Sequence, residues 1–160
     1  MKKFILPGFI SIILLFSNSC SDDKDFKKTS EYLVFGHFYG ECIGEGCVTM
    51  YKLEDDKLFQ DTKKEYPRYD VFYEGSYIEM DQADYDKVKD LFDYFPEQLL
   101  YEHDTTFGCP DCADQGGLYI EYKTNNIHKY WTIDQHKGYV PVFLHDFIEK
   151  VNEKIDLLNN

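Results

Sequence analysis

The sequence predicts an α+β domain in which an antiparallel β-sheet of about five strands carries two helices packed on one face. Three observations predict this fold. Aromatic-rich and alternating segments, typical of strands, come first, and a segment with apolar residues at helical spacing follows them. A hairpin pattern and a second helical pattern complete the chain. Strands that are grouped, and do not alternate one by one with helices, favour an antiparallel sheet with its helices on one side.

Extended segments dominate the first half of the chain. Aromatic and branched residues fill residues 31–39, EYLVFGHFY, and because they fall on both faces we expect this strand to be central. Charged residues and Pro67 predict a loop over 63–70, and an alternating segment follows it. The expected strands before the hairpin are 31–39, 47–53 and 71–80, and residues 57–61 are a candidate for a further short strand.

The sharpest local prediction is a hairpin over 118–134. Asn125 and Asn126 suit a two-residue type I′ turn, because asparagine tolerates a positive φ. Such a turn fixes the register and puts mainly apolar pairs on one face and mainly polar pairs on the other, as a half-buried hairpin requires. The expected pairs are Leu118 with Ile133, Ile120 with Trp131, Tyr122 with Lys129, Glu121 with Tyr130 and Lys123 with His128.

Two helices are expected. Asp81 is a good N-cap for the first, which carries an apolar stripe as far as Phe95 and ends at Pro96. A loop is expected from about 101 to 116. Pro141 fits the first turn of the second helix. The apolar stripe of this second helix is Leu144, Phe147, Ile148, Val151, Ile155 and Leu158.

The N-terminal residues predict export. Lys2 and Lys3 precede an apolar run at 4–16, and small residues follow before Cys20, which is the layout of a secretory signal peptide over residues 1–19. The apolar run is shorter than the ~20 residues of a membrane-spanning helix. Its ending resembles the lipobox of bacterial lipoproteins, in which the cysteine is lipidated and becomes the mature N-terminus. A plain signal peptide with a structural Cys20 is the alternative.

Residues 20–30 are predicted to form a flexible acidic tether. The run SDDKD at 21–25 resembles the acidic export tag of Bacteroidota surface lipoproteins. That resemblance implies a lipid anchor on Cys20 in the outer membrane, recognition by the lipoprotein sorting machinery, and a location at the cell surface. The periplasmic face of the same membrane, and a linker without any sorting role, are the alternatives. Residues 31–160 are then expected to form a single α+β domain.

The charge of the chain restricts its partners. Without residues 1–19 the chain keeps 15 basic and 30 acidic side chains, a net charge near −15. Such a surface repels nucleic acid, because it has no cationic field with which to release counterions. It suits a cationic partner, a divalent ion or a protein with a basic patch. The alternative is that the charge serves only solubility.

Cys42, Cys47, Cys109 and Cys112 form two closely spaced pairs in glycine-bearing loops. An even number of cysteines in an exported protein favours two disulfides, either within each pair or across the pairs. A zinc site made by all four thiolates is a second interpretation, although the pairs lie far apart in the sequence. A third is thiol–disulfide redox chemistry at the C-x-x-C segment 109–112, where the neighbouring carboxylates raise the thiol pKa and so disfavour the reactive thiolate.

The loop that carries the second cysteine pair is also acidic. Asp104, Asp111 and Asp114 could supply oxygen ligands to calcium, although their spacing excludes an EF-hand. A solvated acidic turn is the alternative. The chain has no H-E-x-x-H, G-x-S-x-G, P-loop or G-x-G-x-x-G motif, so no catalytic residue is predicted.

From Gly36 to Asn159 the order of motifs resembles small surface or outer-membrane lipoproteins of Bacteroidota. The motifs are G-x-C-x-x-x-x-C before a strand, an aromatic helix, GCPDCADQGG before the hairpin and a final P-x-x-L-x-x-F helix. The resemblance implies no activity and no cofactor. The first hypothesis is therefore a non-catalytic binding or interaction module for a protein or ligand. A metal-binding module for zinc or calcium is the second hypothesis, and an exported thiol–disulfide redox protein is the third.

Overall fold

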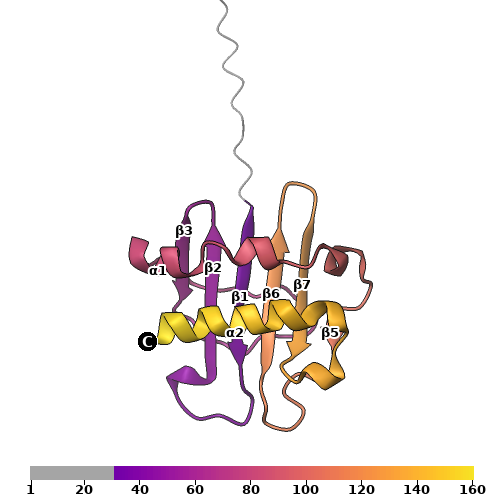
Figure 1. Cartoon of the computed structure of the whole chain (residues 1–160). Coiled ribbons are helices and arrows are strands. Elements are labelled where there is room, and N and C mark those ends of the chain that lie inside the picture. The colour runs from indigo at the N-terminus through magenta and orange to yellow at the C-terminus, as the bar shows by residue number, and fades with distance from the viewer. Residues whose placement is uncertain (1–30) are drawn as a thin grey trace, which may run out of the picture.

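The computed structural model describes residues 31–160, which are built around one seven-stranded sheet (Figure 1). The strand order is β4-β3-β2-β1-β6-β7-β5, and all neighbours are antiparallel except β5 and β7. The strands are β1 (Tyr32–Phe38), β2 (Val48–Glu54), β3 (Lys57–Asp61), β4 (Tyr77–Glu79), β5 (Thr106–Phe107), β6 (Gly117–Lys123) and β7 (His128–Asp134).

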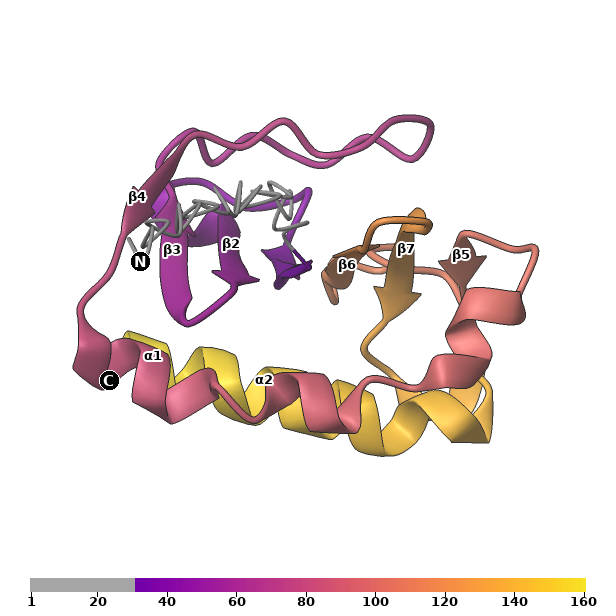
Figure 2. The same ribbon diagram turned by 90° about the horizontal axis from the view of Figure 1, so that it is seen from above.

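Both α-helices lie on one face of this sheet (Figure 2), as the sequence predicts. They are α1 (Gln82–Val88) and α2 (His145–Asn159). Five short 3-10 helices complete the structure: η1 (Glu45–Cys47), η2 (Leu91–Tyr94), η3 (Glu97–Tyr101), η4 (Lys137–Tyr139) and η5 (Val142–Leu144). The signal peptide, the lipidated Cys20 and the tether lie outside the described residues. Among residues 31–160, no helix has the length and apolarity that crossing a bilayer requires.

The prediction that the first strand is central is confirmed. All seven residues of β1 pair with β2 on one side and with β6 on the other. Val34 and Phe35 point to opposite faces of the sheet, yet both are buried. Because β1 is covered on both faces, apolar residues stand next to one another over Tyr32–Phe35 and do not alternate with polar ones.

The helix face of the sheet holds the main hydrophobic core. Trp131 from β7 and Phe35 from β1 are buried there beneath Phe147 of α2. Each fully buried large apolar side chain stabilises the fold by roughly 1.5–3 kcal/mol. The predicted stripe of α2 is confirmed, since its members are buried or partly buried in this core: Leu144, Phe147, Ile148, Val151, Ile155 and Leu158.

The first helix is shorter than predicted. Asp81 caps it, and its side chain accepts a hydrogen bond from the backbone of Asp84, but α1 ends at Val88 and the apolar residues beyond it follow 3-10 turns. The buried amine of Lys154, on α2, donates to the carbonyl of Lys87 and pairs with Asp90. The contact with Lys154 thus satisfies the Lys87 carbonyl, which would accept a hydrogen bond within a longer helix.

The sheet has more strands than the five predicted, and one of them is shorter than expected. Of the predicted strand 71–80, only Tyr77–Glu79 pairs in the sheet, as β4, and residues 71–76 belong to no strand. The predicted loop 101–116 contains the two-residue strand β5, which pairs with the edge of β7. Strands of two or three residues are too short to leave a period-two pattern in the sequence.

The hairpin register is confirmed pair for pair in β6 and β7. The predicted type I′ turn is wrong, because neither Asn125 nor Asn126 has a positive φ. The Thr124 hydroxyl instead accepts hydrogen bonds from the backbone amides of Asn126 and Ile127. The backbone amide of Thr124 also donates to the Ile127 carbonyl at 2.8 Å, so a two-residue loop of another conformation keeps the predicted register.

Candidate functional site

The face of the sheet opposite the helices is covered by one long segment, residues 62–76, which we call the strap (Figure 2). The strap leaves the sheet after Asp61, at the end of β3, and returns at Tyr77, where β4 pairs with β3. Its fifteen residues contain no helix or strand. Loops longer than about 12–15 residues without secondary structure are uncommon in compact domains, and many of them are lids or binding loops.

A second hydrophobic cluster lies under the strap. It contains Val34, Phe38, Val48, Met50 and Tyr119, with Tyr32, Tyr73, Tyr77 and Tyr130 packed against it. The sequence analysis assigned the polar face of the hairpin to solvent. The strap covers that face, so Tyr119 is fully buried and Glu121 is only 3% exposed.

Asp61 holds both ends of the strap. The backbone amides of Lys63, Lys64 and Ser76 donate to its carboxylate, and so does the Tyr73 hydroxyl. Burial alone would raise the pKa of the Asp61 carboxyl, but the hydrogen bond from Tyr73 and those from the amides outweigh it and hold the pKa below its usual value. The strap is therefore fixed at its base by a buried, ionised carboxylate.

Tyrosine hydroxyls hold the middle of the strap. Tyr119 accepts a 2.9 Å hydrogen bond from the backbone amide of Tyr73. Tyr130 donates a 3.1 Å hydrogen bond to the carbonyl of Tyr69. These bonds satisfy backbone groups that would otherwise need a neighbouring strand, and so this segment stays ordered without joining the sheet.

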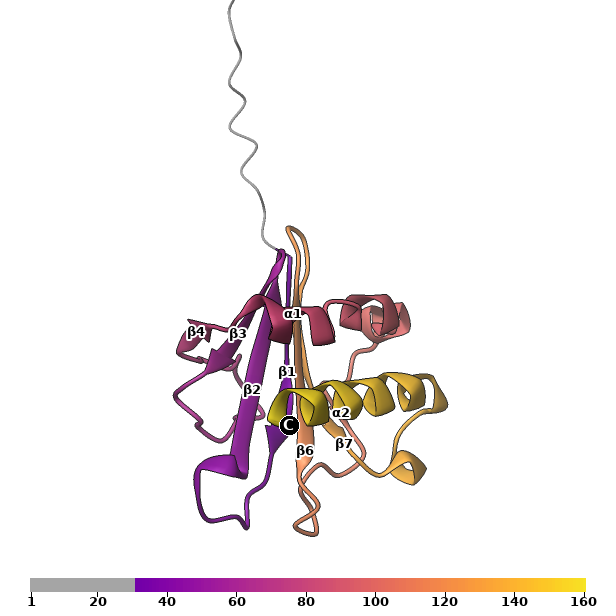
Figure 3. The same cartoon turned by 60° about the vertical axis from the view of Figure 1, so that its left-hand side comes forward.

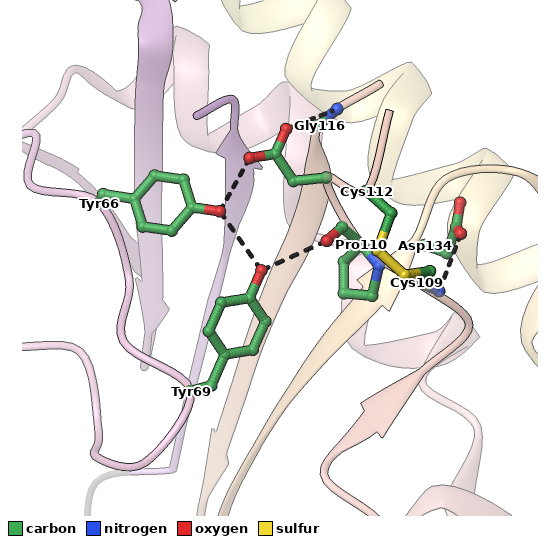
Figure 4. Close-up of a disulfide and its surroundings, with 8 residues drawn as sticks. Tyr66, Tyr69, Cys109, Pro110, Cys112, Gly116 and Asp134 are labelled. Carbon is green, nitrogen blue, oxygen red and sulfur yellow. Dashed lines mark hydrogen bonds between the residues drawn. A yellow bond between two sulfur atoms is a disulfide. The ribbon is translucent and has the colours of Figure 1, made fainter. Parts of the chain in front are cut away.

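The far end of the strap rests on the loop of the second cysteine pair (Figure 4). The Tyr66 hydroxyl donates to the Asp111 carboxylate at 2.9 Å, and the Tyr69 hydroxyl donates to the carbonyl of Pro110 at 3.3 Å. The same Asp111 carboxylate accepts from the backbone amides of Gly40 and Gly116. Asp111 thus joins the strap to both cysteine loops.

The cysteines form two disulfides, each within one close pair. Cys42 and Cys47 have Cα atoms 5.5 Å apart, and Cys109 and Cys112 have Cα atoms 5.4 Å apart. Both loops lie at the end of the sheet away from residue 31 (Figures 1 and 3). The pairing that the sequence left open is therefore the adjacent one, and it leaves no thiolates for the four-cysteine zinc site.

The calcium interpretation gains no support from the acidic loop. Asp111 uses its carboxylate for the hydrogen bonds described above, while Asp104 and Asp114 are exposed. Asp111 and Asp114 both have a positive φ, so this loop is a series of tight turns. Within residues 31–160 no group of three or more His, Cys, Asp or Glu side chains is arranged to hold a metal ion.

Glu121 forms a buried centre between the strap and the sheet. Its carboxylate accepts hydrogen bonds of 2.8 Å from the hydroxyls of Tyr32 and Tyr119, and it pairs with His128 at 2.9 Å. The ring of His128 stacks on Phe72 of the strap, with ring centroids 3.8 Å apart. Burial, followed by the carboxylate nearby, raises the pKa of Tyr32 and Tyr119, so both hydroxyls remain donors.

The two arms of the strap line an open pocket of about 280 Å³, which we call the strap pocket. Two ion pairs lie in its wall or beside it. Lys63 pairs with Glu65 at 3.0 Å, and Arg68 makes two hydrogen bonds to Asp70, of 3.0 and 2.7 Å. The pocket is lined by Lys63, Glu65, Tyr66, Arg68, Val71, Phe72, Tyr73 and Glu74.

The strap also differs from the rest of the domain at its outer surface. Tyr66, Tyr69, Val71 and Phe72 are each 38–42% exposed. Three basic and three acidic side chains balance within residues 62–76, whereas residues 31–160 carry 12 basic and 27 acidic side chains, a net charge of −15. Exposed aromatic side chains of this kind are enriched in protein interfaces.

Comparison with known proteins leaves the family open, since no family model and no curated protein matches the sequence. The structure brings Asp111 and the cysteine loops together with the strap, but it does not gather the other candidate metal ligands. Sequence reasoning missed Asp61, Glu121 and the strap. The signal available in the sequence was a cluster of four aromatic residues at 66–73, in a loop segment that contains a single proline.

Proposed function

We propose that this chain is a lipid-anchored, exported protein of the cell envelope that acts as a non-catalytic binding module, with the strap as its binding surface. The observation that carries the proposal is the ordered strap itself. Tyrosine and phenylalanine side chains offer large contact areas at a low cost in conformational entropy. Asp61, Tyr119 and Asp111 hold the strap in place before any partner arrives, which reduces the entropy lost on binding.

The proposed location rests on the N-terminal sequence. A signal peptide over 1–19 and a lipidated Cys20 would place the domain on the outer membrane, at the cell surface or on its periplasmic face, with residues 20–30 as tether. The two disulfide loops would then be presented away from the residue 31 end, and the strap would lie across the face of the sheet between the two ends. Replacing Cys20 with alanine should move the protein from the membrane fraction to the soluble fraction and abolish its labelling by a fatty acid.

One observation favours the redox hypothesis as a second candidate. Cys109 and Cys112 are exposed and line a shallow pocket of about 260 Å³ beside Tyr139. The carboxylate of Asp134, which accepts a hydrogen bond from the Cys109 amide, works against a reactive thiolate there. This candidate predicts reduction of insulin by the reduced protein, and loss of that activity in Cys109→Ser. Absence of activity in the native protein would remove it.

Site-directed photo-crosslinking tests the binding surface. A photoreactive phenylalanine would replace Tyr69 on the strap or, as the matched control, Tyr101, which is more exposed but lies on η3. In cells that make the full chain, we expect a discrete crosslinked product from position 69 and none from position 101. Equal products from both positions, or none from either, would contradict the proposal.

A further inference from the structure

We propose that the strap pocket receives a cationic side chain, arginine or lysine, from a basic segment of a partner protein. This inference rests on the proposed role of the strap and names the chemistry of its partner. Three aromatic rings line the pocket, those of Tyr66, Phe72 and Tyr73. The face of an aromatic ring attracts a cation through the ring quadrupole, more strongly when water is excluded.

The charges of the strap pocket also favour a cationic ligand. Its two cations are already paired, Lys63 with Glu65 and Arg68 with Asp70. Glu74 also lines the pocket, and within residues 31–160 its carboxylate makes no hydrogen bond or ion pair, acting on Lys63 only through space. The strap pocket therefore offers one uncommitted carboxylate beside aromatic rings.

The net charge of the rest of the domain favours a cationic ligand. Residues 31–160 carry a net charge of −15, which attracts cations and repels anions before contact. At the pocket itself, the carboxylate of Glu74 is the charge that no ion pair neutralises, and it would oppose an anionic ligand. The field thus steers a basic segment towards the domain, and the aromatic pocket gives its side chain a place to bind.

The size of the pocket fits a side chain. About 280 Å³ is just below the range of roughly 300–1,000 Å³ found for sites that bury whole small molecules. A single long side chain could fill it while the rest of the partner segment lies on the exposed rings of Tyr69 and Phe72. Arginine is the better fit, because its planar guanidinium stacks on aromatic rings as well as pairing with carboxylates.

A labelled octapeptide of alternating glycine and arginine is the probe, and fluorescence anisotropy with the full chain in neutral detergent is the measurement. Parallel arms use the lysine, glutamate and serine versions of the peptide. We expect the arginine peptide to bind, the lysine peptide to bind more weakly, and the other two not to bind at ~1 mM protein. Raising NaCl from roughly 20 mM to 150 mM should weaken binding, because the steering field is screened.

Substitutions test whether the arginine peptide binds in the strap pocket. Glu74→Gln should raise the Kd two- to fivefold, the range of one exposed ion pair, and Phe72→Leu should raise it by about the same factor. The matched controls are Asp93→Asn, which removes one negative charge on the helix face, and Tyr101→Leu, which removes an exposed ring elsewhere. Each control should change the Kd by less than about 1.5-fold.

Two results would overturn the inference. One is the absence of binding by both cationic peptides. The other is equal weakening by Glu74→Gln and Asp93→Asn, which would show attraction to the whole acidic surface and not to the strap pocket. If Phe72→Leu disturbs folding by circular dichroism, the comparison of the two carboxylate variants decides alone. Photo-crosslinking from Tyr69 with no binding of the arginine peptide would refute this inference and leave the proposed function standing.

Discussion

The hydroxyl of Tyr73 donates a 2.6 Å hydrogen bond to the carboxylate of Asp61, and this bond joins the returning arm of the strap to the strand from which the strap departs. Asp61 is 2% exposed and also accepts from the amides at both ends of the strap. One carboxylate therefore closes the loop at its base. Its loss should release the strap from the sheet without disturbing the helix face.

Replacing Asp61 with alanine should lower the free energy of unfolding by about 2–4 kcal/mol, because four donors lose a buried charged acceptor. Urea unfolding followed by the fluorescence of Trp131 measures this change. Asp93→Ala, an exposed carboxylate on the helix face, is the control and should change stability by about 0.5 kcal/mol or less. Similar losses in the two variants would show that Asp61 does not hold the strap.

Stability should also fall in acid through Asp61. Its folded pKa is held below the unfolded value by hydrogen bonds that outweigh burial. Such a group stabilises the fold above its unfolded pKa, and this contribution is lost as the pH falls through the folded pKa. We expect the difference in the free energy of unfolding between wild type and Asp61→Asn to be largest above about pH 4 and to shrink progressively as the pH falls below it. A constant difference in the free energy of unfolding across that range would contradict this expectation.

Tyr73 and Tyr77 offer a matched pair of hydroxyl deletions. The Tyr77 hydroxyl is buried, and among residues 31–160 it has no hydrogen-bond partner. Tyr77→Phe should therefore leave the free energy of unfolding unchanged or raise it by up to about 1 kcal/mol, whereas Tyr73→Phe should lower it by about 1–3 kcal/mol. Thermal unfolding of the two variants gives the comparison. A clear loss of stability in Tyr77→Phe would reveal a partner for its hydroxyl.

Alkaline pH should also unfold the domain. Burial, with the hydrogen bond to Glu31, raises the pKa of Tyr122 to about 12, and the pKa values of five tyrosines on the strap face are raised as well: Tyr32, Tyr66, Tyr73, Tyr77 and Tyr119. A raised folded pKa stabilises the fold below the unfolded value near 10, and that contribution is lost as the pH rises further. Absorbance at about 295 nm should show fewer tyrosinates in the folded chain than in the urea-unfolded chain at about pH 10.5. Equal numbers would contradict the buried placement.

The disulfide pairing can be read from peptides. Trypsin without reductant should release residues 29–52 with Cys42 bonded to Cys47, and residues 90–123 with Cys109 bonded to Cys112. Each peptide should weigh two hydrogen masses less than its reduced form, and neither should be linked to the other. A cross-linked species containing both peptides would mean that the pairing runs across the loops. Because each disulfide closes only a short loop, removing either should cost about 2 kcal/mol in the chain-entropy description.

Patterns that repeat along an element were readable from the sequence, and contacts between distant segments were not. The register from Leu118 to Ile133 followed from the two-residue loop at 125–126 together with alternation, and the stripe from Leu144 to Leu158 followed from helical spacing. The break after Val88 could not be predicted, because it involves Lys154, more than sixty residues later. Local periodicity carries no information about such partners.

The candidate site was harder to predict for the same reason. Asp61, Asp111 and Glu121 are three of 30 acidic residues, and only the fold shows which carboxylates meet tyrosine hydroxyls. Alternation predicted a strand over 71–80, but only Tyr77–Glu79 pairs in the sheet, and the Tyr119 hydroxyl holds the backbone of Tyr73 in the part that does not. The even number of cysteines favoured two disulfides, but which cysteines pair could be read only from their distances in the fold.

The position of β1 also determines how the domain resists force. Residue 31 leads directly into β1, which is paired along its whole length with β2 and with β6. Tension applied at residue 31 and opposed at the far end of the sheet would pull β1 along its own axis. The backbone hydrogen bonds on both sides would then be sheared together, and not opened one after another as at a sheet edge. Pulling the domain at residue 31 along β1 should therefore require more force than pulling it from an edge strand.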